Sequence, residues 1–84
     1  MSLEKLRRKI DDIDRQLIPL LNRRAELAVQ IGAIKEMSGK DVLDQTREKF
    51  IIERIKALNA GPLDDSAMQI IFQTIIQQCR EIQK

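Results

Sequence analysis

Residues 3–38, LEKLRRKIDDIDRQLIPLLNRRAELAVQIGAIKEMS, decide how this chain folds. Apolar residues recur there at alternating steps of three and four, at Leu3, Leu6, Ile10, Ile13, Leu17, Leu20, Leu27, Ile31 and Ile34. This spacing predicts one long helix with an apolar seam along one face. Pro19 removes a backbone hydrogen bond, but the register is the same on both sides of it. We therefore expect a kinked helix and not a broken one.

Two cations lie on this apolar face. The heptad spacing between Leu20 and Leu27 places Arg24 on the seam, where an apolar side chain is expected. Lys35 follows eleven residues later, which is about three turns and therefore nearly the same face. A charge on a buried face needs a compensating partner. For Arg24 alone, an ion pair that stabilises the fold is the simpler interpretation.

Two shorter helices follow, over about 45–59 and from about 65 to Gln83. Each has an apolar stripe at helical spacing. Gly39 ends the long helix, and Asp44 caps the second one. Gly61 and Pro62 stop the second helix, and Asp64 or Asp65 caps the third. The sequence thus predicts an all-α fold with one long and two shorter helices, in a single domain over residues 1–84.

The long helix has more apolar surface than its own chain can cover. A helix of about 35 residues is about 50 Å long, and the other two are much shorter. Apolar surface on that scale marks an interface, so we expect an obligate homodimer with a two-fold contact between the long helices. Arg7 lies about 100° around the helix from Arg24, so it is available to a site on the partner chain.

Composition excludes several functions. Aromatic residues are 2% of the chain and the net charge is +2, which disfavours nucleic-acid binding. Histidine is absent, so the usual acid–base side chain near neutral pH is missing. The single cysteine, Cys79, excludes an internal disulfide. No stretch is apolar enough to cross a membrane, and we expect a cytoplasmic protein.

A group of polar residues aligned with the apolar stripes forms the candidate site: Arg24, Lys35, Asp44, Arg47, Glu48, Cys79 and Gln83, with Arg7 from the partner chain. Four cations against two carboxylates suit a ligand with two negative charges. Asp44, Arg47 and Glu48 share one helix face, although a simple capping cluster explains them equally well locally. Cys79 has no histidine to activate it and is more simply a small core residue. Any enzyme here would work by positioning and preorganised electrostatics.

The chain closely resembles the all-helical (type II) chorismate mutase family from Leu6 to Gln83. The resemblance rests on five segments in order: LRRKIDDID at 6–14, LLNRRAELA at 20–28, IGAIK at 31–35, VLDQTRE at 42–48 and IFQTIIQQCREIQ at 71–83. It implies an intertwined homodimer whose two active sites each draw on both chains. It also implies a Claisen rearrangement of chorismate to prephenate, on the path to Phe and Tyr, without a cofactor or covalent intermediate.

The resemblance also implies roles for individual residues. Arg24 and the partner's Arg7 would clamp the substrate carboxylates. Lys35 would hold a carboxylate and donate to the ether oxygen of the breaking bond, and Gln83 would donate to the same oxygen from the other side.

Residues of the second helix would bind the rest of the substrate. Glu48, supported by Asp44, would bind the ring hydroxyl, while Arg47 would help to order the carboxylate end. Cys79 stands where family members often carry a serine that contacts a substrate carboxylate. A thiol is a weaker donor, so Cys79 is not expected to be essential.

Two alternatives stay open at this stage. An isochorismate pyruvate lyase on the same fold would also use a cationic pocket. A non-catalytic helical dimerisation module would explain Arg24 and Lys35 as interhelical ion pairs. The presence of both Glu48 and Gln83 favours the mutase.

Overall fold

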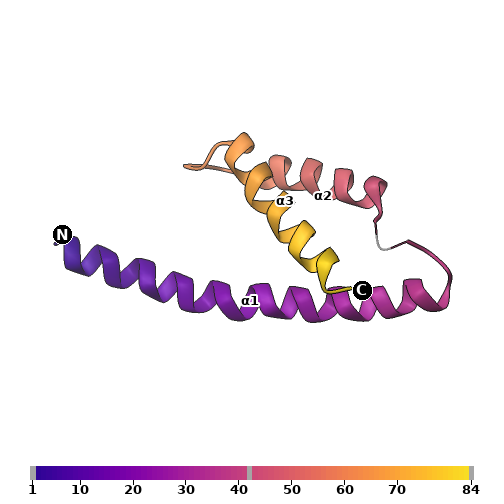
Figure 1. Ribbon diagram of the computed structural model, residues 1–84. Helices are drawn as coiled ribbons and strands as arrows, with labels where there is room; N and C mark the ends of the chain where they lie inside the picture. Colours follow the sequence, from indigo (N-terminus) through magenta and orange to yellow (C-terminus); the bar gives the residue numbers. More distant parts are fainter. Residues whose placement is uncertain (1, 42, 84) are drawn as a thin grey trace.

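The computed structural model describes residues 2–41 and 43–83. These residues form three α-helices and no strand: α1 (Leu3–Met37), α2 (Gln45–Leu58) and α3 (Asp65–Glu81), drawn in Figure 1. The predicted class and order of helices are confirmed. Val42, which begins one of the five family segments, lies outside the described residues.

The helix starts follow the capping residues. The side chain of Ser2 accepts from the backbone N–H of Lys5 at 3.2 Å, and Asp44 and Asp64 cap α2 and α3 in the same way. These side chains satisfy amides that have no partner within the helix.

The long helix runs through Pro19 and ends in a left-handed turn. Figure 1 shows that its axis curves, so the expectation of a continuous helix is confirmed. At its end Gly39 has φ +70°, and the N–H of Lys40 donates to the carbonyl of Lys35 at 2.8 Å. This pair of features is a Schellman ending. The third helix ends at Glu81, two residues short of the predicted Gln83.

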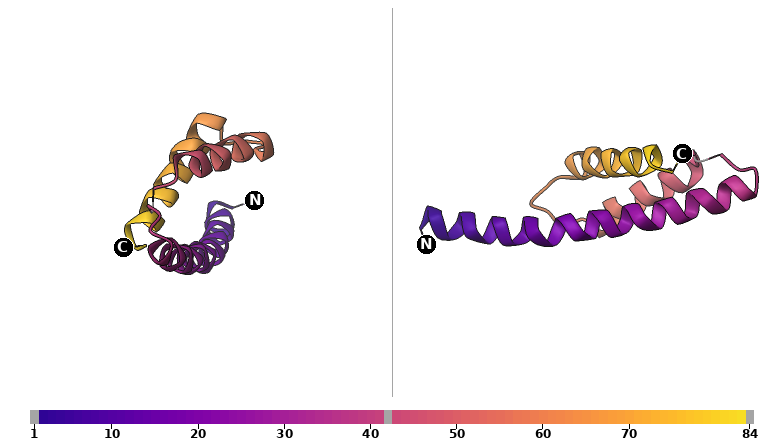
Figure 2. Two further views of the ribbon diagram at one scale, coloured as in Figure 1. Left: turned by 90° about the vertical axis from the view of Figure 1, so that its right-hand side faces the viewer. Right: turned by 60° about the horizontal axis from the view of Figure 1, so that its bottom comes forward.

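The three helices form an open arc, not a closed bundle. Seen along the molecule in Figure 2, α3 lies between α1 and α2, and within the described residues it is the helix that packs on both others. Gly32 permits the contact between α3 and α1. A β-carbon built there would lie 2.9 Å from both Cβ and the carbonyl oxygen of Gln83, so the two segments can approach this closely because residue 32 has no side chain.

A single chain buries few apolar side chains. The buried apolar residues among those described are Ala28, Ile51, Ile55 and Cys79. The accessible surface is 7028 Å², whereas a compact monomer of 9.7 kDa exposes about 5,100 Å². The radius of gyration is 15.8 Å, against about 12 Å for a compact chain of this length. No helix in the described residues is long and apolar enough to span a membrane.

Candidate active site

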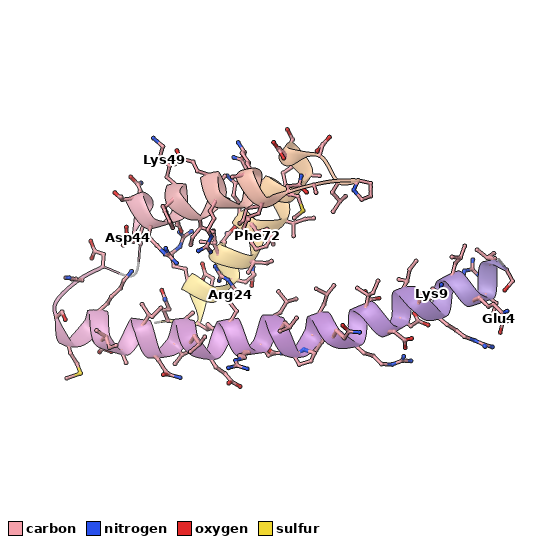
Figure 3. The ribbon with its side chains drawn as sticks, turned by 180° about the vertical axis from the view of Figure 1, so that it is seen from behind. Glu4, Lys9, Arg24, Asp44, Lys49 and Phe72 are labelled. Carbon is pink, nitrogen blue, oxygen red and sulfur yellow. The ribbon has the colours of Figure 1, made fainter. Side chains whose placement is uncertain are left out.

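A cavity of about 300 Å³ lies where the second half of α1, the start of α2 and the end of α3 converge. Seven of the eight residues predicted from the sequence line it: Arg24, Lys35, Asp44, Arg47, Glu48, Cys79 and Gln83. In Figure 3, Arg24 rises from the side of α1 that faces the other two helices, and Asp44 lies at the start of α2. Apolar walls are supplied by Leu27, Ala28, Ile31, Ile51 and Ile76.

Arg24 is held by a sulfur atom. Its Nη1 donates to Sγ of Cys79 at 3.3 Å, and Cys79 is only 7% exposed. The thiol therefore acts here as a weak acceptor and as packing. Arg24 itself is half-buried, and no carboxylate in the described residues forms a salt bridge with it. The structural ion pair, which is the simpler interpretation of Arg24, is thus not formed among the described residues of this chain.

Gln83 reaches the cavity from just beyond the end of α3. Its Nε2 donates to the backbone carbonyl of Ala28 at 2.9 Å, a link that joins α3 to α1. An amide nitrogen carries two hydrogens, so one donor remains for a ligand. The absent side chain of Gly32 is what allows Gln83 to lie this close to α1.

The start of α2 places three charged residues at the cavity. Asp44 accepts from the backbone N–H of Arg47 at 2.9 Å, so it caps the helix and also lines the cavity. The guanidinium of Arg47 lies 5.3 Å from the ring centroid of Phe50, a cation–π contact. Capping the helix and lining the cavity are therefore compatible for Asp44.

Two charged lining residues were not predicted from the sequence, namely Arg54 and Arg80. Arg54 lies seven residues after Arg47, so helical spacing on α2 could have found it. Arg80 forms a salt bridge from Nη1 to Oε1 of Glu48 at 2.5 Å. With these two, the described lining has five cations and two carboxylates. An anionic ligand would balance that excess of positive charge.

Arg7 is the one predicted residue that this chain does not bring to the cavity. It is exposed in the first half of α1, and it is absent from the cavity lining. Its predicted role depends on a partner chain.

The described lining thus defines a cationic site with apolar walls on an all-helical scaffold, suited to a small anion. The family model of chorismate mutase type II matches residues 6–84. The chain is 35% identical to the chorismate mutase of Methanocaldococcus jannaschii over 84 residues, covering 99% of this chain and 85% of that protein. This chain belongs to the chorismate mutase type II family. The family resemblance and the prediction of a chorismate mutase, an isomerase of aromatic amino-acid biosynthesis, are confirmed.

Two further proteins support this placement. A crystal structure of the chorismate mutase from Helicobacter pylori in complex with prephenate superposes with a TM-score of 0.89 at 28% identity, covering 96% of this chain and 88% of that one. The bifunctional chorismate mutase/prephenate dehydratase of Aquifex aeolicus is 37% identical over 87 residues. The match covers 99% of this chain but only 24% of that bifunctional protein.

Proposed function

We propose that this chain rearranges chorismate to prephenate in the cavity between α1, α2 and α3. The observation that carries the proposal is the convergence on one cavity of Arg24 and Lys35 from α1, Glu48 from α2, and Gln83 from just beyond α3. A dicarboxylate substrate would neutralise most of the charge excess there.

The reaction would proceed by positioning and electrostatics. In a Claisen rearrangement the ether C–O bond breaks while a new C–C bond forms within one molecule, so no proton has to be transferred. Negative charge develops on the ether oxygen, and donors held ready for it lower the barrier. Lys35 and the second N–H of Gln83 are the donors we assign to that oxygen.

The remaining polar residues would fix the substrate conformation. Arg24 would bind a carboxylate through its planar fork, and Glu48 would accept a hydrogen bond from the ring hydroxyl. Holding the two reacting ends together removes much of the entropic barrier of a unimolecular reaction. Cys79 would contribute by supporting Arg24.

We further propose that the active form is an intertwined homodimer in the cytoplasm. The six seam residues from Leu3 to Leu20 are between 41% and 64% exposed in the single chain. A second copy would cover them and would bring the partner's Arg7 to the cavity as a second carboxylate clamp.

The test is the ultraviolet absorbance of chorismate over time with purified protein, followed by identification of the product. We expect the wild type to form prephenate, and the Arg24→Ala variant to lose almost all turnover while staying folded. No loss of chorismate with the folded wild type would overturn the proposal. In that case, release of pyruvate from isochorismate would identify the lyase, and failure with both substrates would leave the helical module.

A further inference from the structure

The ion pair between Glu48 and Arg80 joins α2 to α3 at the wall of the cavity. Arg80 Nη1 lies 2.5 Å from Glu48 Oε1, and both side chains are 28% exposed. Nothing in the reaction proposed above uses Arg80. The pair is nevertheless the one described salt bridge that links two different helices, since the other two lie within α1.

The side chain of Glu48 borders two different spaces. It lines the cavity, and it also lines a groove of about 630 Å³ on the other side of α2 and α3. Besides Glu48 and Arg80, that groove carries two lysines, Lys49 and Lys56, and one carboxylate, Glu53. Figure 3 shows Lys49 on the side of α2 away from α1. A carboxylate at this position is therefore drawn by cations outside the cavity as well as by those inside it.

Arg80 lines the same two spaces as Glu48. A guanidinium is always charged and donates in fixed directions, so it holds a carboxylate oxygen in one place. With Oε1 engaged by Arg80, Oε2 is the oxygen left to accept from a ligand. A partly buried pair of this kind is also weakened less by solvent than the exposed pairs of α1.

We propose that Arg80 is a positioning residue, which holds Glu48 so that Oε2 faces the ring hydroxyl of the substrate. This inference rests on the proposed function, because it assigns Arg80 a task only if Glu48 binds that hydroxyl. Arg80 acts through Glu48 and need not touch the reacting atoms.

The experiment compares Arg80→Met, Arg80→Lys, Glu48→Gln and the double variant Glu48→Gln/Arg80→Met in the full chain. We expect Arg80→Met to lower kcat/KM for chorismate by about tenfold to a hundredfold, and Arg80→Lys to restore part of the loss. In the Glu48→Gln background the same Arg80→Met change should add little, because its effect passes through Glu48. Full multiplication of the two losses would overturn the proposal.

A binding measurement separates positioning from a general effect on the cavity. A dicarboxylate analogue that lacks the ring hydroxyl should bind wild type and Arg80→Met equally well, as measured by calorimetry. The analogue that keeps the hydroxyl should bind Arg80→Met more weakly. Equal weakening of both analogues would overturn the proposal.

Asn59 supplies a matched structural control. Its Nδ2 donates to Oδ1 of Asp65 at 2.9 Å, so it too links the α2 end to α3, but away from the cavity. Asn59→Ala should lower the melting temperature and leave kcat/KM unchanged. If Arg80→Met behaves like Asn59→Ala, Arg80 is only structural and this inference fails. If the wild type itself does not convert chorismate, the proposed function fails instead.

Discussion

The two halves of α1 have the same spacing of apolar residues but differ in what packs against them. The first half, residues 3–20, is exposed along its whole length in the single chain. The second half packs against α3 and carries Arg24, Ala28 and Gly32 where the two helices meet. One seam therefore offers an uncovered apolar surface at one end and a cationic cavity at the other. The lesson is that polar replacements on a seam, more than the seam itself, show where the chemistry lies.

The largest effect is expected from making the second half resemble the first. Arg24→Leu restores the apolar rhythm, so the unfolding free energy should stay the same or rise. Activity on chorismate should fall by roughly a thousandfold, because a charged carboxylate clamp is lost. Steady-state kinetics beside thermal unfolding would check both parts. Full turnover in Arg24→Leu would contradict the assignment of the seam cation to the site.

The converse change introduces a charge into the first half. Ile13→Asp would place a carboxylate in the proposed dimer contact, and the dimer dissociation constant should rise by at least about a hundredfold. Activity per chain should then depend on protein concentration, which sedimentation and dilution assays would show.

The control for this change is Arg15→Ser. Arg15 pairs with Asp12 at 2.6 Å, but their side chains are 73% and 66% exposed. Removing this pair should therefore lower the free energy of unfolding by less than about 1 kcal/mol. If Ile13→Asp raises the dimer dissociation constant no more than Arg15→Ser does, the proposed interface is refuted.

A smaller effect is expected at the contact between α1 and α3. Gly32→Ala adds a Cβ that would meet Gln83 at 2.9 Å, so the end of α3 must shift. Alanine also favours the helix by about 1 kcal/mol, so stability should change little while kcat falls by about tenfold. Ala33→Ser, at the exposed neighbouring position, should leave kcat unchanged. An unaltered kcat in Gly32→Ala would show that the position of Gln83 is not critical.

The smallest effect is expected from Cys79→Ser. A hydroxyl can replace the thiol as an acceptor for Arg24 and adds a stronger donor, so kcat/KM should stay within a few-fold of the wild type. Burying a more polar group should cost about 1 kcal/mol of unfolding free energy. A loss of activity as large as that of Arg24→Leu would mean that the sulfur has a role beyond packing.

Local sequence rules account for most of the fold. The spacing of apolar residues and the capping residues predict the positions of all three helices. The unchanged register on both sides of Pro19 correctly predicts that α1 continues through it. The end of α3 is missed by two residues because the apolar stripe extends to Ile82, although the helix does not. Stripe position also identifies seven of the residues with which this chain lines the cavity.

The remaining features depend on how the helices cross. Arg80 directly follows Cys79 on α3, and its partner Glu48 lies 32 positions earlier on another helix. No period or cap in the sequence indicates that these two meet. The same limit applies to Arg7, whose place relative to the cavity depends on a second chain. Contacts within one helix can be predicted from spacing, whereas contacts between helices need the packing geometry.

The central place of α3 has a consequence for motion. Within the described residues it is the helix that packs on both others. Its last turn supplies Cys79 and Arg80 to the cavity, and Gln83 follows just beyond its end. A fluctuation that lifts this segment would release the cavity wall and the link between α1 and α2 in one step. Amide hydrogens near Cys79 should then exchange with solvent at the rate of global opening, and a bound ligand should slow that exchange across all three helices together.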